Sequence, residues 1–147
     1  MEPETAPLSR HRAALAGAAA ATVWALAEPL DQRIFRFLYS DVALLGKAVT
    51  RGRFWRPVGL GLHTANGAVA SLVFRKVDRR IGGSRRRNTM VFAMVEHVAL
   101  YPLTLLTDRF HPARGEPDLP PLSRSARAFA QATFRHALFG VVLGRLV

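Results

Sequence analysis

Long uncharged stretches alternate with short charged or proline-rich segments along this chain of 147 residues. A helix needs about twenty mostly apolar residues to cross a bilayer, and it satisfies its own backbone hydrogen bonds there. The pattern therefore predicts an all-α fold, a four-helix transmembrane bundle in a single integral membrane domain over residues 10–147, after a disordered tail over residues 1–9. The predicted spans lie near residues 13–30, 55–74, 88–107 and 126–146.

The first of these stretches has two interpretations. Residues 13–27 are uncharged and make about 22 Å of helix, which reaches bilayer length only if the helix continues past the Glu-Pro pair at 28–29. Two arginines before a short apolar run, and the Ala-Leu-Ala sequence at 25–27, are also typical of a cleaved signal peptide. A first membrane span and a signal peptide both stay open at this point.

The segment that follows, residues 31–53, is amphipathic, because its cations lie away from one apolar stripe. We expect an interfacial helix on the membrane surface, broken near Ser40 and Asp41. A surface helix of a soluble bundle would show the same pattern. The stripe consists of Ile34, Leu38, Val42, Leu45 and Val49.

The placement of charge favours lipid over nucleic acid as the partner. The net charge is +11, yet half of the residues are hydrophobic, and the cations gather between the apolar stretches rather than on one soluble face. Seven cations fall within residues 75–87, which predicts that this connection and both termini are cytoplasmic in a multi-pass inner-membrane protein. Six cations between residues 33 and 56 oppose that orientation.

Small residues and glutamates recur in a way that suggests internal duplication. In the second and fourth stretches a histidine, His63 or His136, is followed by small residues four and eight positions later. The first and third stretches each carry one glutamate, Glu28 or Glu96. This pattern predicts two duplicated helical hairpins, and the small residues are expected to let helices approach closely.

Polar side chains inside the apolar stretches form the candidate site. A charge near the bilayer centre costs several kcal/mol and normally turns inward to a partner. Several such groups fall at similar depth, which predicts an intramembrane cluster of Glu96, His63, Asn66, Arg135 and His136. In a structural role, Glu96 would pair with Arg135 or accept a hydrogen bond from a histidine; in the alternative role, the cluster would handle protons or ions.

A second set of candidates consists of Glu28, His97, Tyr101 and Asp108. Adjacent helical residues point about 100° apart, so we expect His97 to face Tyr101 while Glu96 faces the cluster. Pro102 is expected to kink the third helix.

Several classes of chemistry are not favoured. Without cysteine, thiolate metal sites and cysteine nucleophiles are excluded, and the histidines and glutamates lack the spacings typical of metal sites, so no metal and no cofactor is predicted. No catalytic residue is assigned, because neither a Ser-His-Asp order nor a phosphate-binding loop occurs. An enzyme is therefore the less favoured class, although it stays open.

The Ala/Gly-rich opening with Trp24 and Glu28, the His-bearing second stretch and the Pro-containing third stretch resemble small uncharacterised bacterial inner-membrane proteins of the YagU-like type. The resemblance extends over roughly residues 13–147 and implies a four-helix membrane protein without an assigned reaction. We therefore expect a structural or accessory membrane protein, with small proton- or ion-coupled transport as the alternative. The expected partners are the lipid bilayer and further copies of the chain.

Overall fold

The chain folds into helices joined by short connections. The computed structural model describes residues 8–147, and within them it holds no strand, so the all-α prediction is confirmed. Residues 1–7 of the predicted tail lie outside the described residues. The elements are α1 (Arg10–Phe35), α2 (Asp41–Val49), α3 (Trp55–Ile81), α4 (Arg85–Leu100), the 3₁₀ turn η1 (Tyr101–Leu103), α5 (Thr104–Phe110) and α6 (Ala126–Leu146).

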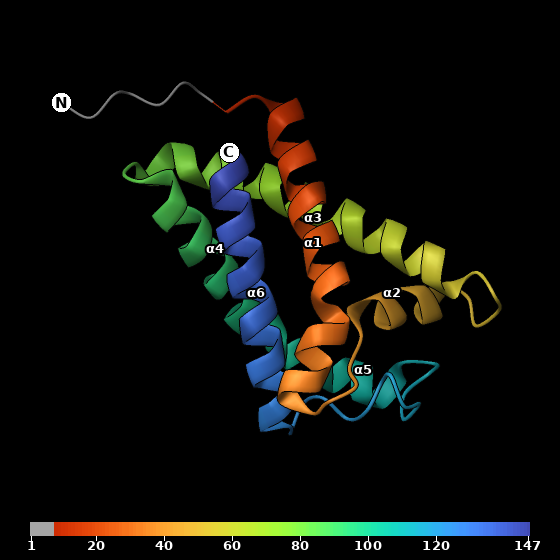
Figure 1. The fold of residues 1–147 in the computed structure, drawn as a ribbon. Coiled ribbons are helices and arrows are strands. Elements are labelled where there is room, and N and C mark those ends of the chain that lie inside the picture. Colours follow the sequence, from red (N-terminus) through yellow and green to blue (C-terminus); the bar gives the residue numbers. More distant parts are fainter. Residues whose placement is uncertain (1–7) are drawn as a thin grey trace.

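Two long helices, α1 and α6, lie side by side at the centre of the molecule (Figure 1). Helix α3 crosses α1, α4 packs along α6, and α2 packs on the first half of α3. Although α3 and α4 are joined by a short turn at residues 82–84, they diverge and make few contacts with each other. The wedge between α3 and α4 holds a cavity that residues of both helices line.

Helix α1 is longer than the uncharged part of the first stretch, residues 13–27. Ser9 caps its first turn, and the helix continues through Pro29 for 26 residues until Arg36 adopts a left-handed backbone conformation. Helix α1 therefore includes the first residues of the amphipathic segment 31–53. That segment is not one continuous helix. The break expected near Ser40 and Asp41 is confirmed, because Ser40 caps α2 and Asp41 is its first residue.

Two helical segments are long and apolar enough to cross a membrane. They are Arg10–Phe35, which is α1, and Arg85–Phe110, which runs through α4, η1 and α5. At Pro102, where a kink is predicted, the 3₁₀ turn η1 interrupts the second of these segments. Helices α3 and α6 are less apolar, and the four-span arrangement stays a prediction.

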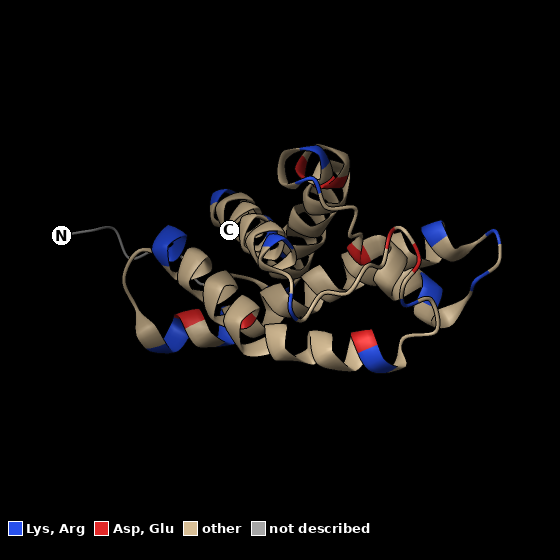
Figure 2. Cartoon of the chain, turned by 90° about the horizontal axis from the view of Figure 1, so that it is seen from below, with Lys and Arg blue, Asp and Glu red and all other residues tan. Residues whose placement is uncertain are grey.

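Large apolar side chains cover much of the outer surface. Leu26 on α1 is 76% exposed, and Val95 and Val98 on α4 are 62% and 63% exposed. Charged side chains lie mainly at helix ends and in connections, and long helical stretches between them carry none (Figure 2). Soluble monomers rarely expose apolar surface on this scale, so these faces are suited to lipid or to another copy of the chain.

The helices approach closely where a glycine faces the neighbouring helix. A Cβ on Gly17 of α1 would lie 2.2 Å from the carbonyl oxygen of Gly67 on α3. In the second predicted hairpin, a Cβ on Gly140 of α6 would lie 3.1 Å from the Cα of Met90 on α4. The packing role of the small residues is confirmed in both pairs, while their origin by duplication stays a prediction.

Candidate functional site

A fully buried arginine, Arg135, joins three elements of the fold. Its Nε and Nη2 donate hydrogen bonds to the carboxylate of Asp31 on α1 at 2.6 and 2.7 Å, and its Nη1 donates to Asp41 on α2 at 2.6 Å. Nη2 also donates to the carbonyl oxygen of Tyr39 at 2.9 Å. Because a guanidinium can donate in several directions at once, this single side chain fixes α6 against α1 and α2.

Two further polar residues complete this network. Gln131, one turn before Arg135, donates to Asp31 at 2.6 Å and to the carbonyl oxygen of Phe37 at 3.1 Å. Glu28 lies 3.7 Å from Arg135 and accepts hydrogen bonds from the Ser40 hydroxyl at 2.7 Å and the Asp41 N–H at 2.8 Å. Glu28 thereby caps the positive end of α2, which favours an anion at that position.

Both alternatives predicted for a structural role of Glu96 are wrong, because within the described residues it neither pairs with Arg135 nor accepts a hydrogen bond from a histidine. The acidic partners of Arg135 come from residues 28–41, which sequence reasoning had placed largely at the membrane surface. Trp24, Glu28 and Asp31 follow one another at steps of four and three, so their shared inward face was the signal that could have identified Asp31. Asp41 lies beyond the end of α1, and no periodicity pointed to it.

Asp41 connects the Arg135 network to a neighbouring pocket. Its carboxylate accepts hydrogen bonds from Trp24 Nε1 at 3.0 Å and from the Tyr39 hydroxyl, besides the one from Arg135. Burial is the largest effect on the pKa of Asp41 and would raise it, but the Arg135 guanidinium together with the hydrogen bonds from Tyr39 and Arg135 outweighs burial, so the pKa is lowered. Asp41 is therefore an ionised carboxylate whose position is fixed from three sides.

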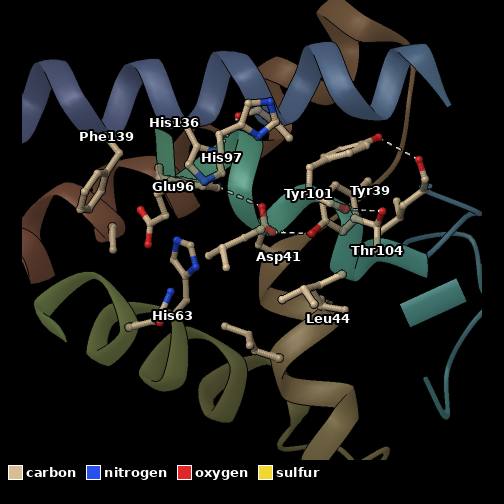
Figure 3. A pocket seen from close by; sticks show the side chains of 18 of the residues that line it. Tyr39, Asp41, Leu44, His63, Glu96, His97, Tyr101, Thr104, His136 and Phe139 are labelled. Atoms are coloured by element: carbon tan, nitrogen blue, oxygen red, sulfur yellow. Dashed lines mark hydrogen bonds between the residues drawn. The ribbon is translucent and has the colours of Figure 1, made fainter. Parts of the chain in front are cut away.

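The pocket has a volume of about 370 Å³, which is in the range of small-molecule sites. It is lined by residues of α1, α2, α3, α4, η1, α5 and α6, and His63 on α3 and Glu96 on α4 lie near each other in its wall (Figure 3). Most of the wall is apolar, with leucines, alanines and Phe139. The titratable side chains in the wall are Tyr39, Asp41, His63, Glu96, His97, Tyr101 and His136.

Trp24 stands between two of the predicted site histidines. Its ring centroid lies 5.2 Å from that of His63 and 4.7 Å from that of His136. His136 Nδ1 lies 2.8 Å from the carbonyl oxygen of Ala132, so Nδ1 carries the proton of that hydrogen bond. The prediction that His63 and His136 belong to one site agrees with this geometry, in which they share Trp24 as a neighbour.

Two polar sites in this pocket lack partners. His63 is only 6% exposed, and although its ring has a backbone hydrogen bond to Ala21, its Nε2 makes no hydrogen bond. Within the described range, Glu96 also has no hydrogen bond and no ion pair, although it lines the same pocket as His63 and His136. Asn66 lines the pocket from the exposed side of α3. The five predicted cluster residues thus divide, with Arg135 in the network and the other four around the cavity.

The second set of candidates has mixed outcomes. His97 contacts Tyr101 as expected, with 5.6 Å between ring centroids. Its ring also lies 4.8 Å from that of His136, so His97 faces the same pocket as the predicted cluster and not a separate side of the helix bundle. The Tyr101 hydroxyl donates to the carbonyl oxygen of Leu122 at 2.9 Å. Asp108 accepts the N–H of Leu122 at 2.8 Å, so it holds the end of the proline-rich loop rather than a ligand.

That loop, residues 111–123, closes one end of the pocket through Leu122. Lys47 on α2 holds it in place, since its Nζ lies 2.7 Å from both Glu116 and Asp118. Burial alone would lower the pKa of Lys47, but its hydrogen bonds to the two carboxylates raise the pKa instead. The pocket is therefore bounded by a firmly docked loop.

No group of three or more His, Asp or Glu side chains in residues 8–147 is arranged to hold a metal ion. No protein-family model, no curated protein and no solved structure matches this chain. The resemblance to YagU-like proteins stays a prediction, and the chemistry of the site rests on its own geometry.

Proposed function

We propose that the protein is an integral membrane protein that binds a small ligand in the pocket beside the Arg135 network. Its four spanning segments would be α1, α3, the α4–α5 run and α6. Apolar faces on the outside and cations at helix ends support this assignment, with the cationic connection at residues 75–87 on the cytoplasmic side. In this proposal α1 is retained rather than cleaved, because it supplies Glu28 and Asp31 to the network.

The network and the pocket have different tasks in this proposal. Every charged group of the network has close partners, as a scaffold that holds helices together requires, although the neutral Gln131 Oε1 accepts no hydrogen bond. In the pocket, by contrast, His63 Nε2 and Glu96 have none, and a buried polar group without a partner costs free energy. This contrast is the observation that carries the proposal, since a ligand would supply the missing partners.

A second candidate function is proton- or ion-coupled transport through the same pocket. It is favoured by the grouping of Glu96 with three imidazoles, since such groups mark proton pathways in membrane proteins. The two functions separate in liposomes: Glu96→Gln would abolish a proton or ion flux under the transport function, whereas under binding alone neither protein produces a flux.

Binding can be followed through Trp24, which lines the pocket. In the Trp55→Phe variant, Trp24 is the one remaining tryptophan of the two in the chain. We expect at least one of three short amphiphiles, octylamine, octanoate or octanol, to change its emission saturably. Asn66→Phe should abolish that change, because Asn66 lies at the exposed edge of the pocket, where a phenyl ring would fill the opening. If none of the three changes Trp24 emission saturably, the ligand-binding function is contradicted.

A further inference from the structure

We infer that the pocket selects an amphipathic amine, with its ammonium group among Glu96, Asp41 and Trp24 and its hydrocarbon chain between α3 and α4. This inference rests on the proposed function and names the chemical class of its ligand. It is carried by the charge of the interior, the aromatic wall and a second cavity that continues the first.

The interior holds more carboxyl groups than cationic groups. With the histidines neutral, four buried or half-buried carboxylates on α1, α2 and α4 face one buried guanidinium, that of Arg135. Two of the four carboxylates, Asp41 and Glu96, line the pocket. An anion in a poorly hydrated site is costly unless a cation accompanies it, so an ammonium group would relieve this excess and a carboxylate group would increase it.

The wall around these carboxylates is suited to a cation. Trp24 donates its Nε1 hydrogen to Asp41 at 3.0 Å, and its ring packs near Phe139 with 6.4 Å between centroids. Both rings line the pocket. Aromatic faces attract ammonium groups, most strongly where water is excluded. His63 Nε2, which has no partner, can accept a hydrogen bond from the same group when the imidazole is in the tautomer protonated at Nδ1.

A second cavity, of about 300 Å³, gives the hydrocarbon chain a place. It lies in the wedge between the diverging helices α3 and α4, and its walls include Val69, Val73, Phe92 and Val95. It shares Asn66 and Glu96 with the first pocket, among other residues, so the two spaces adjoin. Glu96 therefore stands at the junction, where a head group would meet the polar pocket and a chain would follow the apolar wedge.

The wedge also provides a route from the lipid phase. If α3 and α4 span the membrane, their diverging faces open towards acyl chains, and an amphiphile can enter sideways without crossing water. A fatty carboxylate could take the same route, but its head group would meet Asp41 and Glu96. A fatty alcohol could hydrogen-bond to His63 without any gain from charge. Of the three classes, the amine is the one whose head group is attracted by the carboxylates of the pocket while its chain fits the apolar wedge.

The test compares three head groups on one chain length. Protein with Trp55→Phe is placed in nanodiscs of zwitterionic phosphatidylcholine, so that the bilayer itself does not concentrate the amine. Octylamine, octanoate and octanol are titrated while Trp24 emission is recorded. We expect octylamine to bind at least tenfold more tightly than the other two. Glu96→Gln should weaken octylamine binding at least tenfold, and Glu96→Asp, which keeps the charge, should retain most of it.

Asp118→Asn is the matched control, since it removes one carboxylate from the loop outside the pocket and leaves Lys47 paired with Glu116. It should leave octylamine binding unchanged. Tighter binding of octanoate or octanol than of octylamine would overturn the amine inference while leaving the proposed ligand-binding function standing. Equal octylamine affinity of the native and Glu96→Gln proteins would also overturn it. Absence of binding by all three compounds would contradict both proposals.

Discussion

Replacing Arg135 with glutamine is expected to prevent recovery of a folded, monodisperse protein. The substitution removes the one cation that faces Asp31, Asp41 and Glu28, and all three carboxylates would then be buried without it. Removing one partner of a buried ion pair costs about 3–5 kcal/mol, which is comparable to the total stability of many small domains. Lysine should not rescue the fold, because an ammonium cannot reproduce the directed hydrogen bonds of the guanidinium.

Arg127→Gln is the control for this experiment, since Arg127 lies on the same helix and is exposed. The measurements are the yield after detergent extraction, the profile in size-exclusion chromatography and the thermal unfolding midpoint. An Arg135→Gln protein that elutes and unfolds like the Arg127→Gln protein would show that the network does not hold the bundle together.

The second large effect is expected from a single methyl group on α3. A Cβ at Gly59 would lie 2.0 Å from the carbonyl oxygen of Val42, and a backbone carbonyl cannot rotate out of the way as a side chain can. Gly59→Ala must therefore push α2 away from α3. Overpacking typically costs about 1–3 kcal/mol and sometimes more, and here it also shifts Asp41, which belongs to both the network and the pocket.

Gly61, on the same helix, provides a closely matched comparison. A Cβ there has no atom within 4 Å, so Gly61→Ala is expected to be neutral or to stabilise the helix by about 0.5–1 kcal/mol. The test compares the thermal unfolding midpoints of the two variants in the same detergent. If Gly59→Ala unfolds at or above the midpoint of Gly61→Ala, the close contact of α2 with α3 is wrong.

Element boundaries could be predicted where the sequence carries local signals. Ser125 caps α6 just before its predicted start, and the proline-rich segment after Phe110 is free of regular helix, as expected. The break before Asp41 was also foreseen, because Ser40 is a typical capping residue. These signals act within a few residues, so no knowledge of the tertiary fold is needed to recognise them.

The partners of Arg135 could not be predicted in the same way. Asp31 and Asp41 lie 104 and 94 positions away along the sequence, and the turn after Phe35 that brings them together depends on tertiary packing. Depth along a helix placed Glu96 and Arg135 at one level, but it does not fix the rotation of each helix. Glu96 consequently faces the pocket, while Arg135 faces α1 and α2.

Thermal unfolding of His63→Leu tests most directly whether the polar lining of the pocket serves a ligand rather than the fold. His63 Nε2 has no partner, so leucine should leave the midpoint unchanged or raise it by about 2–4 °C. His111 is the matched control, because both of its ring nitrogens have partners, the Leu44 carbonyl oxygen at 2.8 Å and the Ala113 N–H at 3.1 Å.

His111→Leu should therefore lower the midpoint, whereas His63→Leu should not. The same His63→Leu protein should lose the change in Trp24 emission that a bound amphiphile causes. A fall of several degrees on replacing His63, comparable to the fall on replacing His111, would contradict the account and assign His63 to the scaffold.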